Sequence, residues 1–355
     1  MGDIIKKTRI EELDIIKCIA ILMVVFGHTL CPVHLKVLFY WVHMPLFFLL
    51  SGITAPDINK YSTRGGYFGF IKKRIKTLYV PFIEYALPFV LFHNALFALG
   101  IDPNHFSSKE YVFQIIHTLL MTNGPSEVHL GAFWFLKVLF LAEIIYATIA
   151  YISHNQKVTN GICIIFGLIA LIANKGIFPH VLQGNVIMPL RGLFYYTIAQ
   201  VIFKDIRWKK IWYISIPIVL WWIVESFTAP YTEGNIQILS ICSLNSIYQI
   251  VFTCGLFMIL FLVSGYLKVF KTSSWMKWMG RNTIPLYLLH QIMFTFISFI
   301  IMKLGYDMDG ATIVKNRFIT CIPWWAYGIL VIPCCYLVQA IISRGFNTIK
   351  MITKL

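Results

Sequence analysis

Long apolar stretches separated by short polar ones recur along the whole chain. Each stretch is about 17 to 25 residues long, which suits a helix that crosses a hydrocarbon core of ~30 Å. The pattern predicts an all-α, polytopic integral membrane bundle that occupies residues 1–355 as a single transmembrane domain. We expect about ten transmembrane helices, near residues 15–32, 37–55, 78–100, 132–152, 161–175, 186–203, 211–227, 246–267, 284–302 and 323–343.

Composition and charge agree with this interpretation. Hydrophobic residues make up 58% of the chain, charged residues only 13%, and the mean hydropathy is +0.74, values that exclude an ordinary soluble domain. The net charge of +15 could suggest nucleic acid as a partner. However, most Lys and Arg residues fall in every second predicted loop, which is typical of cytoplasmic loops facing anionic lipids. We therefore expect membrane lipids as partners, no nucleic acid, and both termini in the cytoplasm.

Two ionisable residues mark the first predicted span. His28 follows Lys17 by eleven residues, so in a helix both side chains lie on one face, about 16 Å apart along the axis. Ionisable groups within a membrane are costly and usually functional. A ligand with an anionic head and a long thin arm, such as a coenzyme A thioester, could reach from Lys17 to His28. Two structural alternatives remain open: Lys17 could pair with Asp14 or extend to the interface, and His28 could be a hydrogen-bonded core residue.

The rise per residue of a helix gives an expected depth in the membrane for each of the other intramembrane polar residues. These depths fall into two layers. His43 and Arg191 come out level with His28, and so do His93 and Lys137. The layer nearer the cytoplasm contains Lys17 together with Glu84 and His290, flanked at the inner surface by Arg74, Lys76 and Arg281.

Two sequence motifs carry a family resemblance. Residues 13–28 read LDIIKCIAILMVVFGH, and residues 43–52 read HMPLFFLLSG. Together they resemble the opening of membrane acyltransferase family 3, and the second motif is similar to that of its fucose-4-O-acetylase-like branch. Residues 71–82, 133–136 and 279–290 are similar to later landmarks of that family, in the same order.

The resemblance implies an O-acyltransferase in the plasma (inner) membrane. It would transfer an acyl group, most often acetyl from acetyl-CoA, to a hydroxyl of a cell-surface or secreted carbohydrate. His28 would be the general base, although a covalent acyl-histidine relay is also open. From their position in the chain, His43 could orient His28, bind the acceptor or cap the bend at Pro45, and Arg191 could stabilise the developing oxyanion or an anionic acceptor, or lie near the outer headgroups. No metal is expected.

Donor binding is expected at Lys17, Arg74, Lys76 and His290. Many family members have arginine where this chain has Lys17, and lysine lacks the two-pronged geometry that suits phosphate. Trp134 and Glu143 are candidates for acceptor binding, but Trp134 could instead belong to the aromatic belt of the membrane.

Two questions stay open at the sequence level. One is whether copies associate as a homo-oligomer. The other is a rival function, an exporter or flippase of a glycan or lipid-linked sugar, since about ten spans with intramembrane charges suit that function equally well. An acyltransferase must bind acyl-CoA, whereas an exporter has no need of it.

Overall fold

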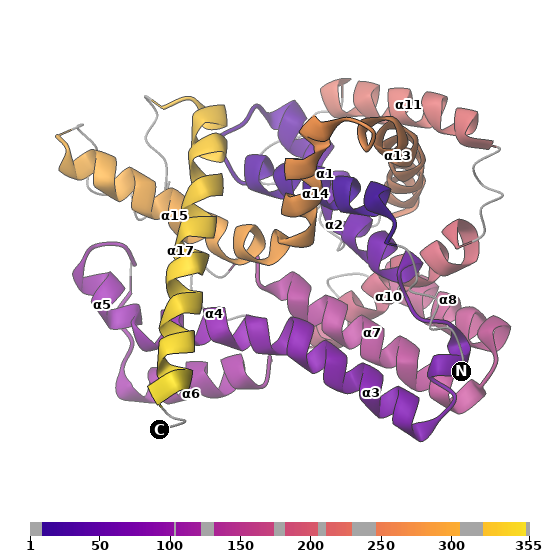
Figure 1. Cartoon of the computed structure of the whole chain (residues 1–355), viewed down its shortest axis with the longest axis horizontal. Coiled ribbons are helices and arrows are strands. Elements are labelled where there is room, and N and C mark those ends of the chain that lie inside the picture. The colour runs from indigo at the N-terminus through magenta and orange to yellow at the C-terminus, as the bar shows by residue number, and fades with distance from the viewer. Residues whose placement is uncertain are drawn as a thin grey trace.

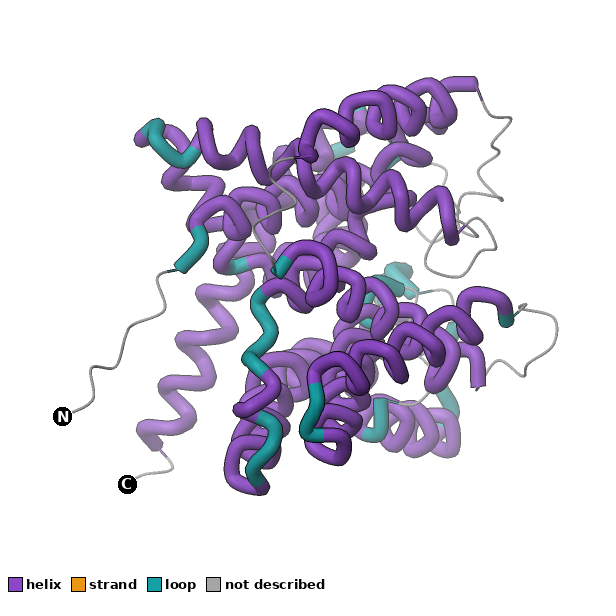
Figure 2. The backbone as a smooth tube through the Cα atoms, turned by 90° about the vertical axis from the view of Figure 1, so that its right-hand side faces the viewer, coloured by secondary structure: helices purple, strands orange, loops and turns teal. Residues whose placement is uncertain are grey.

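Helices are the only regular elements in the part of the chain that the structure describes. This computed structural model describes residues 9–102, 104–121, 131–173, 182–204, 211–228, 246–305 and 322–352. Figures 1 and 2 show the described residues as helices, with short loops between some of them. The predicted all-α, polytopic membrane fold is thereby confirmed.

Seven of the described helices are long and apolar enough to cross a membrane. In chain order they are α2 (Val33–Ile53), α7 (Trp134–Ser153), the continuous run Gln183–Phe203 around α10 (Met188–Ile198), the segment Ile211–Thr228 that contains α11 (Ser215–Thr228), α13 (Ser246–Leu267), α15 (Thr283–Lys303) and α17 (Trp324–Ile352).

Two further predicted spans form shorter helices of 17 residues, α1 (Glu11–Gly27) and α8 (Gln156–Ile172). α1 begins before the predicted boundary at residue 15 and ends at Gly27, so His28 lies at its C-cap. Its charged first turn explains this difference, because Glu11, Glu12 and Asp14 are helical without being apolar.

The third predicted span, 78–100, is wrong in its boundaries. The helix starts at Arg64, where Thr63 accepts a hydrogen bond from the Gly66 amide, and it ends at Leu91. It consists of α3 (Arg64–Arg74), the π-helical turn η2 (Ile75–Tyr79) and α4 (Val80–Leu91), about 42 Å in all. Figure 1 shows α3 and α4 end to end beside α7.

After Leu91 the chain reverses direction through α5 (His93–Ala98) and α6 (Ser108–Leu119). Polar contacts hold this turn: His93 Nε2 lies 2.7 Å from the Asn104 carbonyl, and Asn94 exchanges two hydrogen bonds with the backbone of Phe106. The Tyr79 hydroxyl donates to the Leu119 carbonyl at 2.7 Å, so α6 ends level with the start of α4. His93 therefore stabilises the turn in which it lies.

α1 packs between α2, α13, α15, α17 and the short helix α14 (Ser274–Arg281). Two glycines allow backbones to approach closely. A Cβ at Gly280 would lie 1.8 Å from the Asp14 carbonyl oxygen, and one at Gly52 would lie 2.1 Å from the Tyr196 carbonyl oxygen. Small residues at such contacts are characteristic of helix packing in membranes. They fix α14 against α1 and α2 against α10.

Candidate functional site

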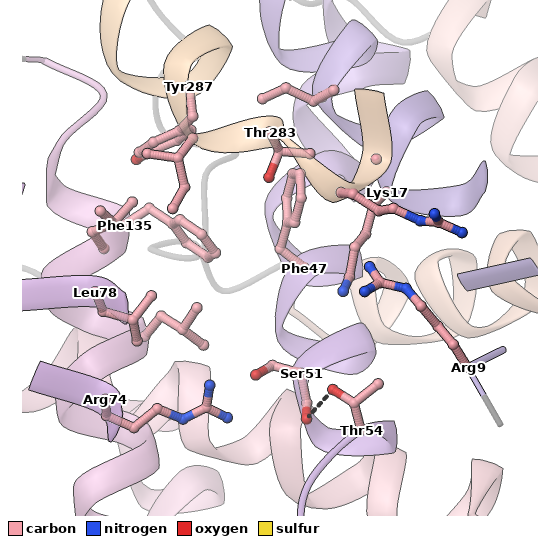
Figure 3. A pocket seen from close by; sticks show the side chains of 16 residues that line it. Arg9, Lys17, Phe47, Ser51, Thr54, Arg74, Leu78, Phe135, Thr283 and Tyr287 are labelled. Carbon is pink, nitrogen blue, oxygen red and sulfur yellow. Dashed lines mark hydrogen bonds between the residues drawn. The ribbon is translucent and has the colours of Figure 1, made fainter. Parts of the chain in front are cut away.

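A cavity of about 240 Å³ lies where α1, α2, α3, α7, α14 and α15 meet. We call it the donor cavity, after the acyl donor that the sequence resemblance leads us to expect at Lys17 and Arg74; Figure 3 shows the cavity. Four cationic side chains line it, namely Arg9, Lys17, Arg74 and Arg281, and a largely apolar wall includes Ile21, Phe47, Leu78, Phe135 and Tyr287. A site with this lining suits a ligand that is anionic at one end and uncharged along the rest.

Asp14 holds two of the four cations in place. Arg9 donates to both carboxylate oxygens, at 2.7 and 2.8 Å, and Arg281 Nε donates to Oδ2 at 2.9 Å. Hydrogen bonding to Asp14 raises the pKa of Arg9, so its guanidinium stays charged. Lys17 makes no hydrogen bond within the described residues, and the hydrogen bonds of Asp14 go to the arginines instead. Its ammonium is thus available to a ligand.

Glu143 holds the third cation. Its Oε2 lies 2.7 Å from Arg74 Nε, and Ser51 Oγ donates to its other oxygen. Glu143 is buried, and Arg74 reaches it from the end of α3, where the π-helical turn η2 begins. Such turns are frequent at functional sites because they redirect the neighbouring side chains. Four cations and two carboxylates leave an excess positive charge at the cavity.

A second group of residues, the histidine cluster, gathers at the far end of α1. The His28 ring stacks on Tyr40 at 5.4 Å and meets His290 edge-on at 5.0 Å, and Tyr40 meets His43 at 5.1 Å. His28 and His43 are expected at the same depth, and in the structure both rings contact Tyr40, which lies between them. The expected depth of His290 is wrong, because the residue lies against His28 rather than in the layer of Lys17.

The three histidines share one hydrogen-bond pattern. Each places Nδ1 against the carbonyl four residues earlier in its own helix: His28 on Val24 at 3.0 Å, His290 on Leu286 at 2.8 Å, and His43 on Phe39. A carbonyl can only accept, so in the neutral imidazole the proton is on Nδ1 and the lone pair is on Nε2. The His28 side chain is half-buried.

Three helices connect the donor cavity to the histidine cluster. On α1, Lys17 and Ile21 line the cavity, and His28 lies two helical turns farther along the same face. On α2, Phe47 lines the cavity and His43 lies one turn earlier in the helix. On α15, Tyr287 lines the cavity and precedes His290 by three residues. The donor cavity and the histidine cluster are therefore built on the same three helices.

Four predicted site residues lie outside both groups or contact other partners. Arg191 is buried and donates to the carbonyls of Ala170 and Ala173 at 2.7 Å, so it binds the C-terminal end of α8. Lys76 is exposed and does not line the donor cavity. Trp134 is half-buried beside Phe135. Glu143, predicted to bind the acceptor, contacts Arg74 and Ser51 instead.

The structure adds Arg9 and Tyr40, which sequence reasoning missed, and Ser51, which from the sequence is expected only to allow close helix packing. Arg9 precedes the first span and looks like any interfacial cation, so nothing in the sequence distinguishes it. Tyr40 could have been found, because it lies three residues before His43 on the same helical face. No group of three or more potential metal ligands occurs within the described ranges.

Comparison with known proteins gives one match. A family model described as an acyltransferase domain matches residues 10–343. No curated protein and no solved structure matches the chain.

Proposed function

The chain belongs to membrane acyltransferase family 3 and is a multi-pass membrane acyltransferase; from this premise we propose that it transfers an acetyl group from acetyl-CoA to a carbohydrate hydroxyl. The observation that carries the proposal is the connection between the cationic donor cavity and the histidine cluster along α1, α2 and α15. The phosphates of the donor bind at one end of this site, and the thioester reaches the other.

The donor cavity suits coenzyme A in charge and in shape. Lys17, Arg74 and Arg281 face the cavity, and arginine in particular binds phosphate through two parallel hydrogen bonds. Beyond them, Phe47 and Phe135 offer an apolar path for the uncharged arm. Glu143 keeps the Arg74 guanidinium at the rim and is therefore a positioning residue.

The chemistry requires one base. His28 Nε2 removes the proton of the acceptor hydroxyl, and the alkoxide oxygen attacks the thioester carbonyl. The tetrahedral intermediate then expels the coenzyme A sulfur as the C–S bond breaks, and the His28 proton passes to that thiolate. The products are an acetyl ester and free coenzyme A. The C-terminal end of α1 stabilises the imidazolium that forms on His28.

We propose that the acceptor is a hydroxyl of a cell-surface or secreted carbohydrate, that the protein acts in the plasma membrane, and that it belongs to the fucose-4-O-acetylase-like branch of the family. His28 supports this choice, because imidazole accepts a hydroxyl proton near neutral pH. Tyr40 and His43 lie beside it and offer hydrogen-bonding groups to a sugar. Trp134 provides a further aromatic surface at the start of α7.

Acetyl transfer by the purified protein in nanodiscs tests the proposal. With radiolabelled acetyl-CoA, the wild type should bind the donor saturably and release acetyl to the acceptor or to water. His28→Ala should bind the donor and lose turnover by at least about 100-fold, the contribution of a general base. His34→Ala is the control, because His34 stacks on Phe227 outside the cluster and its loss should leave turnover unchanged. Turnover by His28→Ala at the wild-type rate would contradict the mechanism, and failure to bind millimolar acetyl-CoA would favour an exporter.

A further inference from the structure

A second cavity, of about 450 Å³, lies next to the donor cavity between α4, α14, α15 and α17. Arg281 and Ile284 line both cavities, so the two are direct neighbours. The mechanism above does not use the second cavity. Its lining is nevertheless specific enough to indicate a ligand.

One wall of the second cavity is aromatic. The rings of Trp278 and Tyr336 lie 4.5 Å apart, and Trp278 is 51% exposed, so the indole offers a surface for stacking. Tyr336 is held in place by its hydroxyl, which donates to the Asn282 carbonyl at 3.0 Å. Planar heterocycles such as nucleobases bind to walls of this kind.

Two hydrogen-bond acceptors line the second cavity. Gln339 Oε1 is buried and has no hydrogen-bond partner among the described residues. A buried acceptor without a donor costs free energy, and a ligand N–H would remove that cost. The exposed carboxylate of Glu84 also lines the cavity and can accept from an N–H or O–H group. An aromatic wall with acceptors fits an amino-substituted base such as adenine.

Arg281 supplies the charge between the two cavities. It binds Asp14 through Nε, and its terminal nitrogens make no hydrogen bond within the described ranges. A phosphate at the border between the cavities would therefore meet a fixed guanidinium. The same ligand could then continue into the donor cavity toward Lys17.

We propose that the second cavity binds the adenosine 3′-phosphate end of coenzyme A. The adenine ring stacks on Trp278, its exocyclic amine donates to Gln339 Oε1, and Arg281 binds a phosphate between this end and the arm in the donor cavity. The assignment rests on the proposed function, because it divides one donor between two adjoining cavities.

Binding of adenosine 3′,5′-bisphosphate to the full chain in nanodiscs tests the site without any turnover. The wild type should bind this probe saturably, and Trp278→Ala should weaken binding about tenfold, the effect of one lost stacking contact. Gln339→Leu should weaken it as well and keeps the side-chain volume. Trp275→Ala is the matched control, since Trp275 lies on the same helix, is 52% exposed and does not line the cavity. Equal affinity in Trp278→Ala, Gln339→Leu and the wild type would overturn the proposal, and so would absence of binding.

Steady-state kinetics with two donors separates this inference from the proposed function. Trp278→Ala and Gln339→Leu should raise KM for acetyl-CoA and leave KM for acetyl-4′-phosphopantetheine, which lacks the adenosine, unchanged. An equal rise for both donors would contradict the adenosine site. If neither donor is turned over while the bisphosphate binds as expected, the proposed function fails and the site remains.

Discussion

At the scale of single residues, neighbouring charges decide what each ionisable group can do. Asp14 engages Arg9 and Arg281, which leaves Lys17 without a hydrogen bond among the described residues. Arg74 is shared between Glu143 and the donor cavity. Lys76, two residues later, is exposed. Two cations that look equivalent in the sequence therefore differ in their access to a donor.

Single substitutions should separate these two cations. Arg74→Ala removes a guanidinium that lines the donor cavity and leaves Glu143 buried without its ion-pair partner, so KM for acetyl-CoA should rise about tenfold or more. Lys76→Ala should leave KM for acetyl-CoA within about twofold of the wild-type value, because an exposed charge outside the cavity contributes little to donor binding. Initial rates over a range of acetyl-CoA concentrations provide the measurement. Equal effects of the two substitutions would show that donor affinity depends on the total positive charge at the inner surface and not on Arg74 in particular.

At the scale of helices, close contacts set the positions of the functional side chains. Gly280 allows α14 to lie directly on the backbone of α1, and the next residue, Arg281, thereby reaches Asp14. The ion pair from Lys277 on α14 to Glu11 at 3.1 Å supports the same contact, and Lys268, directly after α13, pairs with Glu12 at 2.6 Å. The donor cavity exists because α14 is held against the first turn of α1.

Gly280→Ala should disturb this contact. Its Cβ would lie 1.8 Å from the Asp14 carbonyl oxygen, so α14 must move, at a cost of about 1–3 kcal/mol of folding stability. The displacement of Arg281 should also weaken donor binding. Gly265→Ala on α13 is the control, since a Cβ there meets nothing within 4 Å and a helical alanine is more favourable than glycine by roughly 0.5–1 kcal/mol. Thermal unfolding in detergent and coenzyme A binding measure the two effects. A Gly280→Ala protein as stable as Gly265→Ala would contradict the packing argument.

At the scale of the whole molecule, the donor cavity joins elements that are distant in the sequence. Its lining comes from α1, α2, α3, α7, α14 and α15. A ligand that fills the cavity therefore contacts all six of these elements at once. Donor binding and global stability are therefore linked.

Coenzyme A should stabilise the whole protein against heat. A ligand that binds only the folded state at 100 times its dissociation constant adds about 2.7 kcal/mol of stability. The midpoint of thermal unfolding should rise with coenzyme A concentration in the wild type, and the rise should require higher concentrations in Arg74→Ala. Pantetheine, which lacks the phosphates, is the control ligand and should shift the midpoint little. A midpoint of thermal unfolding that does not change with coenzyme A concentration would argue against coenzyme A binding in the donor cavity.

The sequence by itself determined the class of fold, the family and the alignment of Lys17 with His28, because hydrophobic length and helical periodicity are local properties. It also identified His43, His290 and Arg74 as residues of interest. Their roles in binding and catalysis stay predictions until the variants are measured.

Only the tertiary structure decided which polar residues meet. The depth estimate placed His290 with Lys17 and Arg191 with His28, but it carries no information on helix tilt or rotation. In the structure His290 lies against His28, and Arg191 binds the carbonyls at the end of α8. The partners of Glu143 and the boundaries of the helix Arg64–Leu91 also depend on contacts between segments far apart in the chain. Hydrophobicity sets where a helix can cross the membrane, whereas packing sets which of its faces meets which neighbour.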